Sequence, residues 1–102
     1  MAKTKSATEG LGRPVLVTTI HRGVFFGYLD GAPGETVTLR QARNCLYWSD
    51  DVRGFMGLAA SGPSKSCRVG PAVPELTLMG VTSIVGCTAA AAEAWEAQPW
   101  KA

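Results

Sequence analysis

Residues 15–40 read VLVTTIHRGVFFGYLDGAPGETVTLR. A His-Arg-Gly triplet and an Asp-Gly-Ala-Pro-Gly run interrupt this stretch, and both are typical turn sequences. β-Branched and aromatic residues fill the rest, as expected of strands joined by tight turns. The stretch therefore predicts three strands, at residues 15–20, 24–29 and 35–40.

Two details of this stretch indicate how the strands pack. Gly27 stands inside the second strand, where glycine is typical of a bulge or a sharp bend. The third strand alternates polar and apolar residues, so Val37 and Leu39 are expected to point into the core. One face of that strand is therefore predicted to be buried.

The remainder of the chain offers shorter strands and one helix. Turn residues and apolar runs predict a corner at 41–44, a short strand at 45–48, a strand at 55–59, a loop at 61–66, an edge or crossing segment at 67–74, and strands at 75–79 and 81–85. Pro71 and Pro74 keep the edge segment out of the centre of a sheet. Thr88 is a suitable N-cap for an alanine-rich helix, predicted over residues 88–97.

These elements favour a mainly β fold, namely a small antiparallel barrel or sandwich of about five to seven short strands with one C-terminal α-helix. Strands and helices do not alternate, so a doubly wound parallel sheet is not expected. The chain has 102 residues, which suits one domain. We expect residues 14–102 to form that single domain and residues 1–13 to form a flexible N-terminal arm.

The composition is that of a globular protein, with 46% apolar and 18% charged residues and a formal net charge of +2. The N-terminal residues lack an apolar leader, and no run approaches the roughly 20 apolar residues that span a bilayer. The three cysteines are an odd number, which does not suit a set of structural disulfides. We therefore expect free thiols, no membrane association and a cytoplasmic chain.

Several familiar motifs are incomplete. Residues 57–66, GLAASGPSKS, resemble a phosphate-binding loop, but Pro63 follows the second glycine and Lys65 comes two residues late. The cysteines have no Cys-x-x-Cys spacing and one histidine accompanies them, so neither a metal site nor a cofactor is predicted. A nucleophilic pair of His21 with a cysteine is kept as the enzyme hypothesis, and no catalytic residue is assigned.

Arginine and aromatic residues form the most informative group. The candidate ligand-binding residues of this kind are Arg22, Arg43, Arg68, Tyr47 and Trp48. Arginine binds phosphate groups with two donors and aromatic rings stack on bases, so the group suits a nucleotide or a nucleic acid. Residues 15–87 carry six basic and five acidic residues, however, so ion pairs of these arginines remain an open interpretation. Trp48 also suits a core position.

Two parts of the chain resemble known groups of proteins. Residues 15–29 and the segment TVTLRQA at 36–42 resemble the first half of an SH3-like or Sm-like small β-barrel. Residues 42–49, ARNCLYWS, with the Gly-Leu-Ala and Gly-Pro segments of 57–63, are similar to small proteins encoded by tailed phages and prophages. The phage resemblance implies a non-enzymatic role, and Sm-like barrels often assemble into rings through their edge strands.

The first hypothesis is a non-enzymatic, homo-oligomeric phage accessory protein. It would bind an anionic ligand, either a nucleotide or a nucleic acid, through the arginine and aromatic residues. The alternative is a protein–protein interaction component, part of the virion or an inhibitor of a host protein, with no small-molecule ligand. The expected location is the cytoplasm of the bacterial host or the virion.

Overall fold

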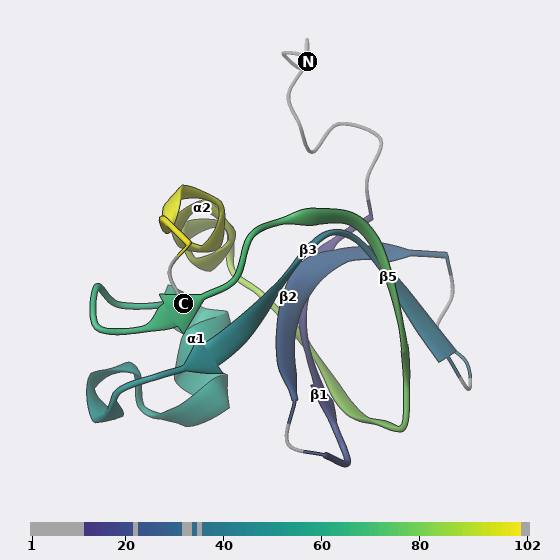
Figure 1. The fold of residues 1–102 in the computed structure, drawn as a ribbon, viewed down its shortest axis with the longest axis horizontal. Helices are drawn as coiled ribbons and strands as arrows, with labels where there is room; N and C mark the ends of the chain where they lie inside the picture. The colour runs from purple at the N-terminus through teal and green to yellow at the C-terminus, as the bar shows by residue number, and fades with distance from the viewer. Residues whose placement is uncertain (1–11, 22, 32–33, 35, 101–102) are drawn as a thin grey trace, which may run out of the picture.

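The computed structural model describes residues 12–21, 23–31, 34 and 36–100 (Figure 1). The described residues form six β-strands, a short 3-10 helix and two α-helices. In chain order these are β1 (Pro14–Thr19), β2 (Val24–Asp30), β3 (Thr36–Tyr47), η1 (Asp50–Val52), α1 (Gly54–Ser61), β4 (Arg68–Val69), β5 (Val73–Met79), β6 (Val81–Gly86) and α2 (Ala89–Ala97).

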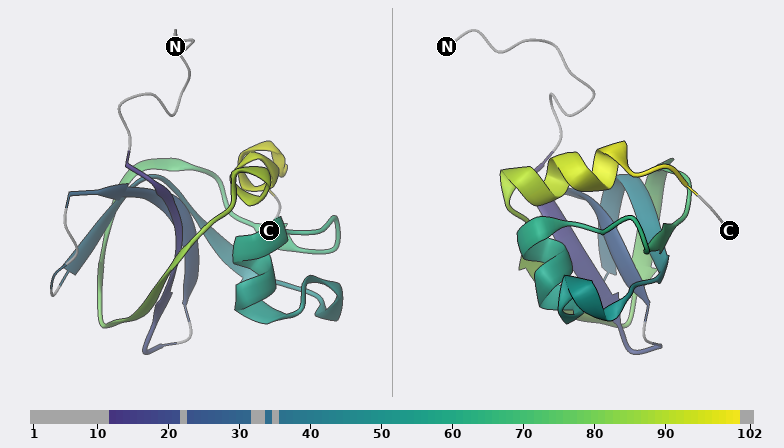
Figure 2. Two further views of the ribbon diagram at one scale, coloured as in Figure 1. Left: turned by 180° about the vertical axis from the view of Figure 1, so that it is seen from behind. Right: turned by 90° about the vertical axis from the view of Figure 1, so that its left-hand side faces the viewer.

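All six strands belong to one antiparallel sheet with the order β4-β3-β2-β1-β6, and β5 pairs with β3 beside β4. β5 and β6 lie at opposite ends of the sheet but follow each other in the chain, separated by Gly80. The sheet therefore curls until its two ends share one turn, and both helices lie on one outer side of it (Figure 2). The mainly β, antiparallel prediction with a C-terminal helix is confirmed.

β3 is one continuous strand with a bulge, so the predicted corner at 41–44 is wrong. Tyr28 pairs with Arg40 and Phe26 pairs with Arg43, which leaves the single residue Gly27 opposite two residues of β3. The bulge predicted at Gly27 is confirmed. A Cβ at this position would lie 2.8 Å from the Cβ of Leu39. The strand continues because β5 pairs with β3 on its other side.

The two faces of the curled sheet cover two hydrophobic clusters. Val15 and Val17 of β1 point into the curl, whereas Leu16 between them points to the helices, as the period of a strand requires. The cluster inside the curl contains the inward residues predicted for β3 and comprises Val15, Val17, Leu29, Val37, Leu39, Ala42 and Leu78. The β1–β3 region thus has apolar side chains buried on both faces.

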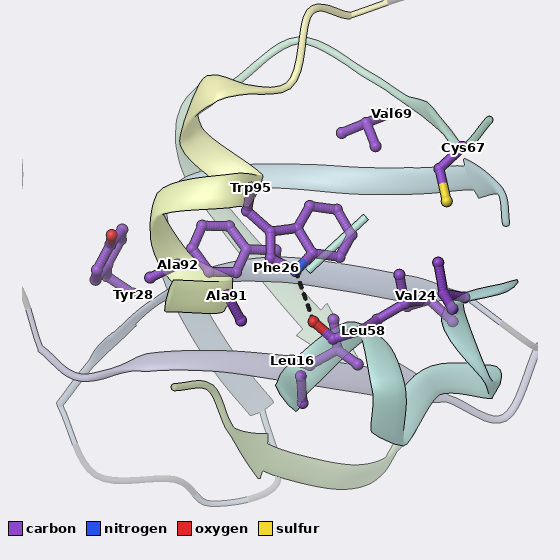
Figure 3. Close-up of a cluster of buried hydrophobic side chains, with 12 residues drawn as sticks. Leu16, Val24, Phe26, Tyr28, Leu58, Cys67, Val69, Ala91, Ala92 and Trp95 are labelled. Atoms are coloured by element: carbon purple, nitrogen blue, oxygen red, sulfur yellow. Dashed lines mark hydrogen bonds between the residues drawn. The ribbon is translucent and has the colours of Figure 1, made fainter. Parts of the chain in front are cut away.

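The cluster between sheet and helices is organised around Trp95 of α2 (Figure 3). Its ring stacks on Phe26 with centroids 5.3 Å apart and planes 2° apart. Its indole Nε1 donates a hydrogen bond of 3.1 Å to the carbonyl oxygen of Leu58 in α1. One side chain therefore joins both helices to β2.

The strand predicted at 55–59 is wrong, because these residues lie in α1. Their apolar side chains follow one another without alternation, and such a run fits a buried helix as well as a strand. Leu58 and Ala59 face Trp95 in the helix-side cluster. Packing against α2 therefore decides the conformation.

The remaining predicted strands and the predicted C-terminal helix agree with the structure at their centres. Thr88 caps α2, since its side chain accepts a 3.0 Å hydrogen bond from the amide of Ala91. Pro74 lies in β5, which among the described residues pairs only with β3 and is therefore an edge strand. The predicted arm at residues 1–13 lies almost wholly outside the described residues. Neither described helix is long and apolar enough to cross a membrane.

Candidate functional site

Arg43 extends from β3 to the C-terminal end of α2. Its Nη1 donates to the carbonyl oxygens of Trp95 and Gln98, both at 2.6 Å, and its Nε donates to the carbonyl of Gly70 at 2.8 Å. The last carbonyls of a helix lack partners within the helix, and a cation there also complements the helix dipole. Arg43 therefore fastens α2 and the segment at Gly70 to the sheet.

The charge of Arg43 is buried, and no carboxylate among the described residues pairs with it. Its side chain belongs to a residue that is only 6% exposed, and this burial lowers the pKa of the guanidinium. The ion pairs found among the described residues join Arg40 to Asp30 and Glu75, not Arg43 to an acid. Within the same residues, Nη2 of Arg43 has no hydrogen-bond acceptor. Two N–H groups of a buried cation thus have no partner in the described part of the chain.

A cavity of about 220 Å³ lies next to this guanidinium, between α2, β2 and β3. We call it the α2 pocket, and its lining residues are Phe26, Gln41, Arg43, Ala72 and Glu96. Phe26 and Arg43 are buried and form its floor, whereas Gln41, Ala72 and Glu96 are exposed and form its rim. The pocket therefore opens to solvent above a buried cation and an aromatic ring.

Tyr28 holds the acidic residue of the rim in place. Its phenol Oη donates a hydrogen bond to Oε2 of Glu96, across the contact between β2 and α2. Burial raises the pKa of Tyr28, and the hydrogen bond to the Glu96 carboxylate and the charge of that carboxylate raise it further. Tyr28 is therefore a neutral donor over the ordinary pH range, and it fixes one oxygen of Glu96.

Residues 12–95 match the family DUF6948, described as a domain of unknown function. The chain belongs to this family. No curated protein and no solved structure matches the chain. In this DUF6948 chain the matched region runs from the residues before β1 into the last turn of α2, so it includes four of the five residues of the α2 pocket.

The five residues predicted to bind a ligand do not form one surface in the DUF6948 chain. Arg68 of β4 is exposed and pairs across the ladder with Tyr47 of β3, which is 52% exposed. Trp48 is partly buried against the helix-side cluster, and Arg43 is buried beneath α2. Arg22 lies outside the described residues. The structure thus brings Arg68 and Tyr47 together and places Arg43 at a different site.

The structure shows where the incomplete motifs of this chain lie. The first glycine of the phosphate-loop-like segment, Gly57, lies within α1, and Gly62 ends that helix with a φ of 85°. A phosphate-binding loop instead precedes a helix, so its amide groups face the ligand. His21 is exposed, and no hydrogen bond joins it to a cysteine among the residues described. Those residues hold no group of three potential metal ligands.

Sequence reasoning selected Arg43 but none of the other residues of the α2 pocket. Gln41 could not be identified from the sequence. Its distinguishing feature is a positive φ of 51°, which results from the bulge opposite Gly27. Glu96 belongs to the exposed side of α2, and nothing in its sequence context distinguishes it from Glu93. The hydrogen bond from Tyr28 is what sets Glu96 apart.

Proposed function

We propose that this DUF6948 chain is a non-enzymatic binding protein whose α2 pocket takes the anionic group of a small ligand. The proposal rests on the position of Arg43. This buried cation lies at the pocket floor, and its Nη2 has no acceptor among the described residues. A carboxylate or phosphate oxygen in the pocket would accept a charge-assisted hydrogen bond from this donor, and such a bond is roughly twice as strong as one between neutral groups.

The size of the pocket supports a compact ligand. Ligand sites for drug-sized molecules are commonly about 300–1,000 Å³. The α2 pocket has about 220 Å³, which favours a small carboxylate or phosphate ester over a whole nucleotide. A nucleic acid would instead have to use the exposed pair of Tyr47 and Arg68. The homo-oligomeric state, the phage setting and a cytoplasmic or virion-associated location stay predictions.

A second candidate function, protein–protein interaction, is favoured by one apolar surface. Ile20 is 64% exposed and Met79 is 73% exposed, and the amide of Ile20 donates to the carbonyl of Gly80 at 2.9 Å. Both side chains therefore lie at the end of the curled sheet where the β1–β2 and β5–β6 turns meet. Large exposed apolar side chains that gather in one place are typical of interaction sites.

NMR titration of the ¹⁵N-labelled protein with acetate, propionate, inorganic phosphate and a short oligonucleotide would test the proposal. We expect the small anions to shift the Nε–Hε signal of Arg43 and the amides of Gln41 and Ala72. Ala72→Trp fills the rim while retaining Arg43, so it should weaken anion binding at least tenfold. Arg68→Ala is the matched control and should leave the dissociation constant unchanged within twofold.

Two results would contradict this site. Binding that survives Ala72→Trp but is lost in Arg68→Ala would place the ligand at the exposed Tyr47–Arg68 pair. If none of the probes shifts the pocket signals, the protein-interaction alternative would be favoured. Ile20→Ser with Met79→Ser should then change the oligomeric state measured by native mass spectrometry.

A further inference from the structure

The charges around the α2 pocket narrow the class of ligand. Resting on the proposed function, we infer that the pocket binds a zwitterion the size of an amino acid. Its carboxylate would contact Arg43 on the floor and its ammonium group would contact Glu96 on the rim. The inference follows from the arrangement of these two side chains, from the role of Tyr28 and from the volume of the pocket.

Arg43 and Glu96 line the same cavity but form no ion pair with each other. Among the described lining residues, Arg43 is the cationic one and Glu96 the anionic one. A ligand with a negative charge alone would be attracted by Arg43 and repelled by Glu96, and a ligand with a positive charge alone would meet the reverse. A ligand that carries both charges is attracted by both residues.

Tyr28 prepares Glu96 for this role. An ionised carboxylate only accepts hydrogen bonds, and the Tyr28 phenol occupies Oε2. Oε1 has no hydrogen-bond donor among the described residues, so it remains open to a ligand donor. An ammonium group brings three donors and a full positive charge. Because β2 holds Glu96 through Tyr28, little side-chain freedom is lost when the ligand binds.

The volume and the apolar part of the lining fit the carbon skeleton of such a ligand. The pocket of about 220 Å³ is smaller than the roughly 300–1,000 Å³ of sites for drug-sized molecules, which suits a ligand as small as an amino acid. Phe26 on the floor and Ala72 on the rim offer an apolar surface to a short side chain. The carboxamide of Gln41 offers both a donor and an acceptor beside it.

NMR titration with the twenty common amino acids, followed by analogues of the tightest binder that lack one charged group, would test this inference. For alanine, the analogue without the ammonium group is propionate and the analogue without the carboxylate is ethylamine. We expect the amino acid to bind roughly three- to fivefold more tightly than the deamino acid, since Glu96 is exposed and screened by water. The amine should bind at least tenfold more weakly, because Arg43 is buried.

The variant Glu96→Gln retains an acceptor for Tyr28 but removes the charge. It should abolish the preference for the amino acid over its deamino analogue and leave binding of the deamino acid as tight or tighter. Glu93→Gln, on the same helix and outside the pocket lining, is the matched control and should retain the preference.

Equal affinities for the amino acid and its deamino analogue in the unaltered protein would overturn the zwitterion inference. A preference that survives in Glu96→Gln would overturn it as well. In both cases, binding of propionate or phosphate at Arg43 would still support the proposed anion site. If no probe binds, the inference and the proposed function fail together.

Discussion

Arg43 of β3 donates a 2.6 Å hydrogen bond to the backbone carbonyl of Trp95, whose own ring is stacked on Phe26 of β2. The residue at the floor of the α2 pocket therefore binds the same helical turn that anchors the helix-side cluster. Ligand site and core share this turn, so any change at Arg43 affects both. For this reason the rim residues, and not Arg43, are the positions at which binding is best tested.

The first prediction concerns the stability that Arg43 provides. Arg43→Met retains an unbranched apolar side chain but leaves the carbonyls of Gly70, Trp95 and Gln98 without this donor. Hydrogen bonds to charged groups contribute about 1.5–3 kcal/mol each and are not fully additive, so we expect a loss of about 3 kcal/mol or more. Urea unfolding followed by circular dichroism measures the change.

Arg68→Met is the control for that measurement, because Arg68 is an exposed arginine of the same sheet. Surface substitutions usually change stability by less than about 0.5 kcal/mol. An equal loss of unfolding free energy in the two variants would show that the three hydrogen bonds of Arg43 do not stabilise the fold.

The second prediction is that Gly57→Ala destabilises the protein although alanine is the better helix former. Alanine in a helix interior gains about 1 kcal/mol over glycine. At Gly57, however, an added Cβ would lie 1.6 Å from the carbonyl oxygen of Val52, a backbone atom outside α1. Because η1 and α1 would have to separate, we expect a net loss of about 1–3 kcal/mol in thermal or urea unfolding.

Gly34→Ala provides the comparison, since a Cβ at Gly34 would meet no atom of the described residues within 4 Å. Its stability should stay within about 0.5 kcal/mol of the parent. A Gly57→Ala protein more stable than the parent would show that α1 and η1 do not pack as closely as described.

The sequence predicts an element well where local residues determine its conformation, and poorly where contacts with distant residues determine it. β1, β2 and the first half of β3 carry strand residues and turn residues in order, so local signals suffice. Residues 55–59 carry an unbroken apolar run, and the packing of Leu58 and Ala59 with Trp95 favours a helix there. The bulge beside Gly27 was predictable from the glycine, but its partner Gln41 was not.

The α2 pocket was predictable only in part for the same reason. Sequence identified Arg43 as a phosphate-binding type of side chain, but its three acceptors are backbone carbonyls at positions 70, 95 and 98. Carbonyls are present at every residue and leave no trace in composition. The grouping of Arg43 with Arg68 therefore rested on residue type, whereas burial separates them in the structure.

The third prediction concerns the bulge itself. Gln41 has a φ of 51°, a conformation that β-branched residues rarely adopt. Gln41→Val should therefore destabilise the protein by about 1–2 kcal/mol, although valine is the better strand former. Thr36→Val, at the exposed start of the same strand, should be neutral or slightly stabilising. Equal effects of the two variants on the urea midpoint would argue against the bulge.

The fourth prediction links the cysteines to the pH dependence of stability. Burial raises the pKa of Cys45 to about 11, and the nearby Cys67 adds to this effect. Burial also raises the pKa of Cys87 to about 11. An unperturbed thiol ionises near pH 8.5. Between about pH 9 and pH 11 the unfolded chain therefore releases thiol protons that the folded chain retains, and ionisation favours the unfolded state.

Stability should consequently be unaffected by these thiols below about pH 8 and should fall as the pH rises from about 9 to about 11. Urea unfolding at pH 8, 9.5 and 11, in the parent and in a Cys45→Ala, Cys87→Ala variant, measures how much these two thiols contribute to the pH dependence of stability. The variant starts from a lower stability because two partly buried side chains are shortened, so the slopes with pH are compared and not the absolute values. We expect a shallower slope in the variant, and identical slopes would show that the two thiols ionise as readily in the folded chain as in the unfolded one.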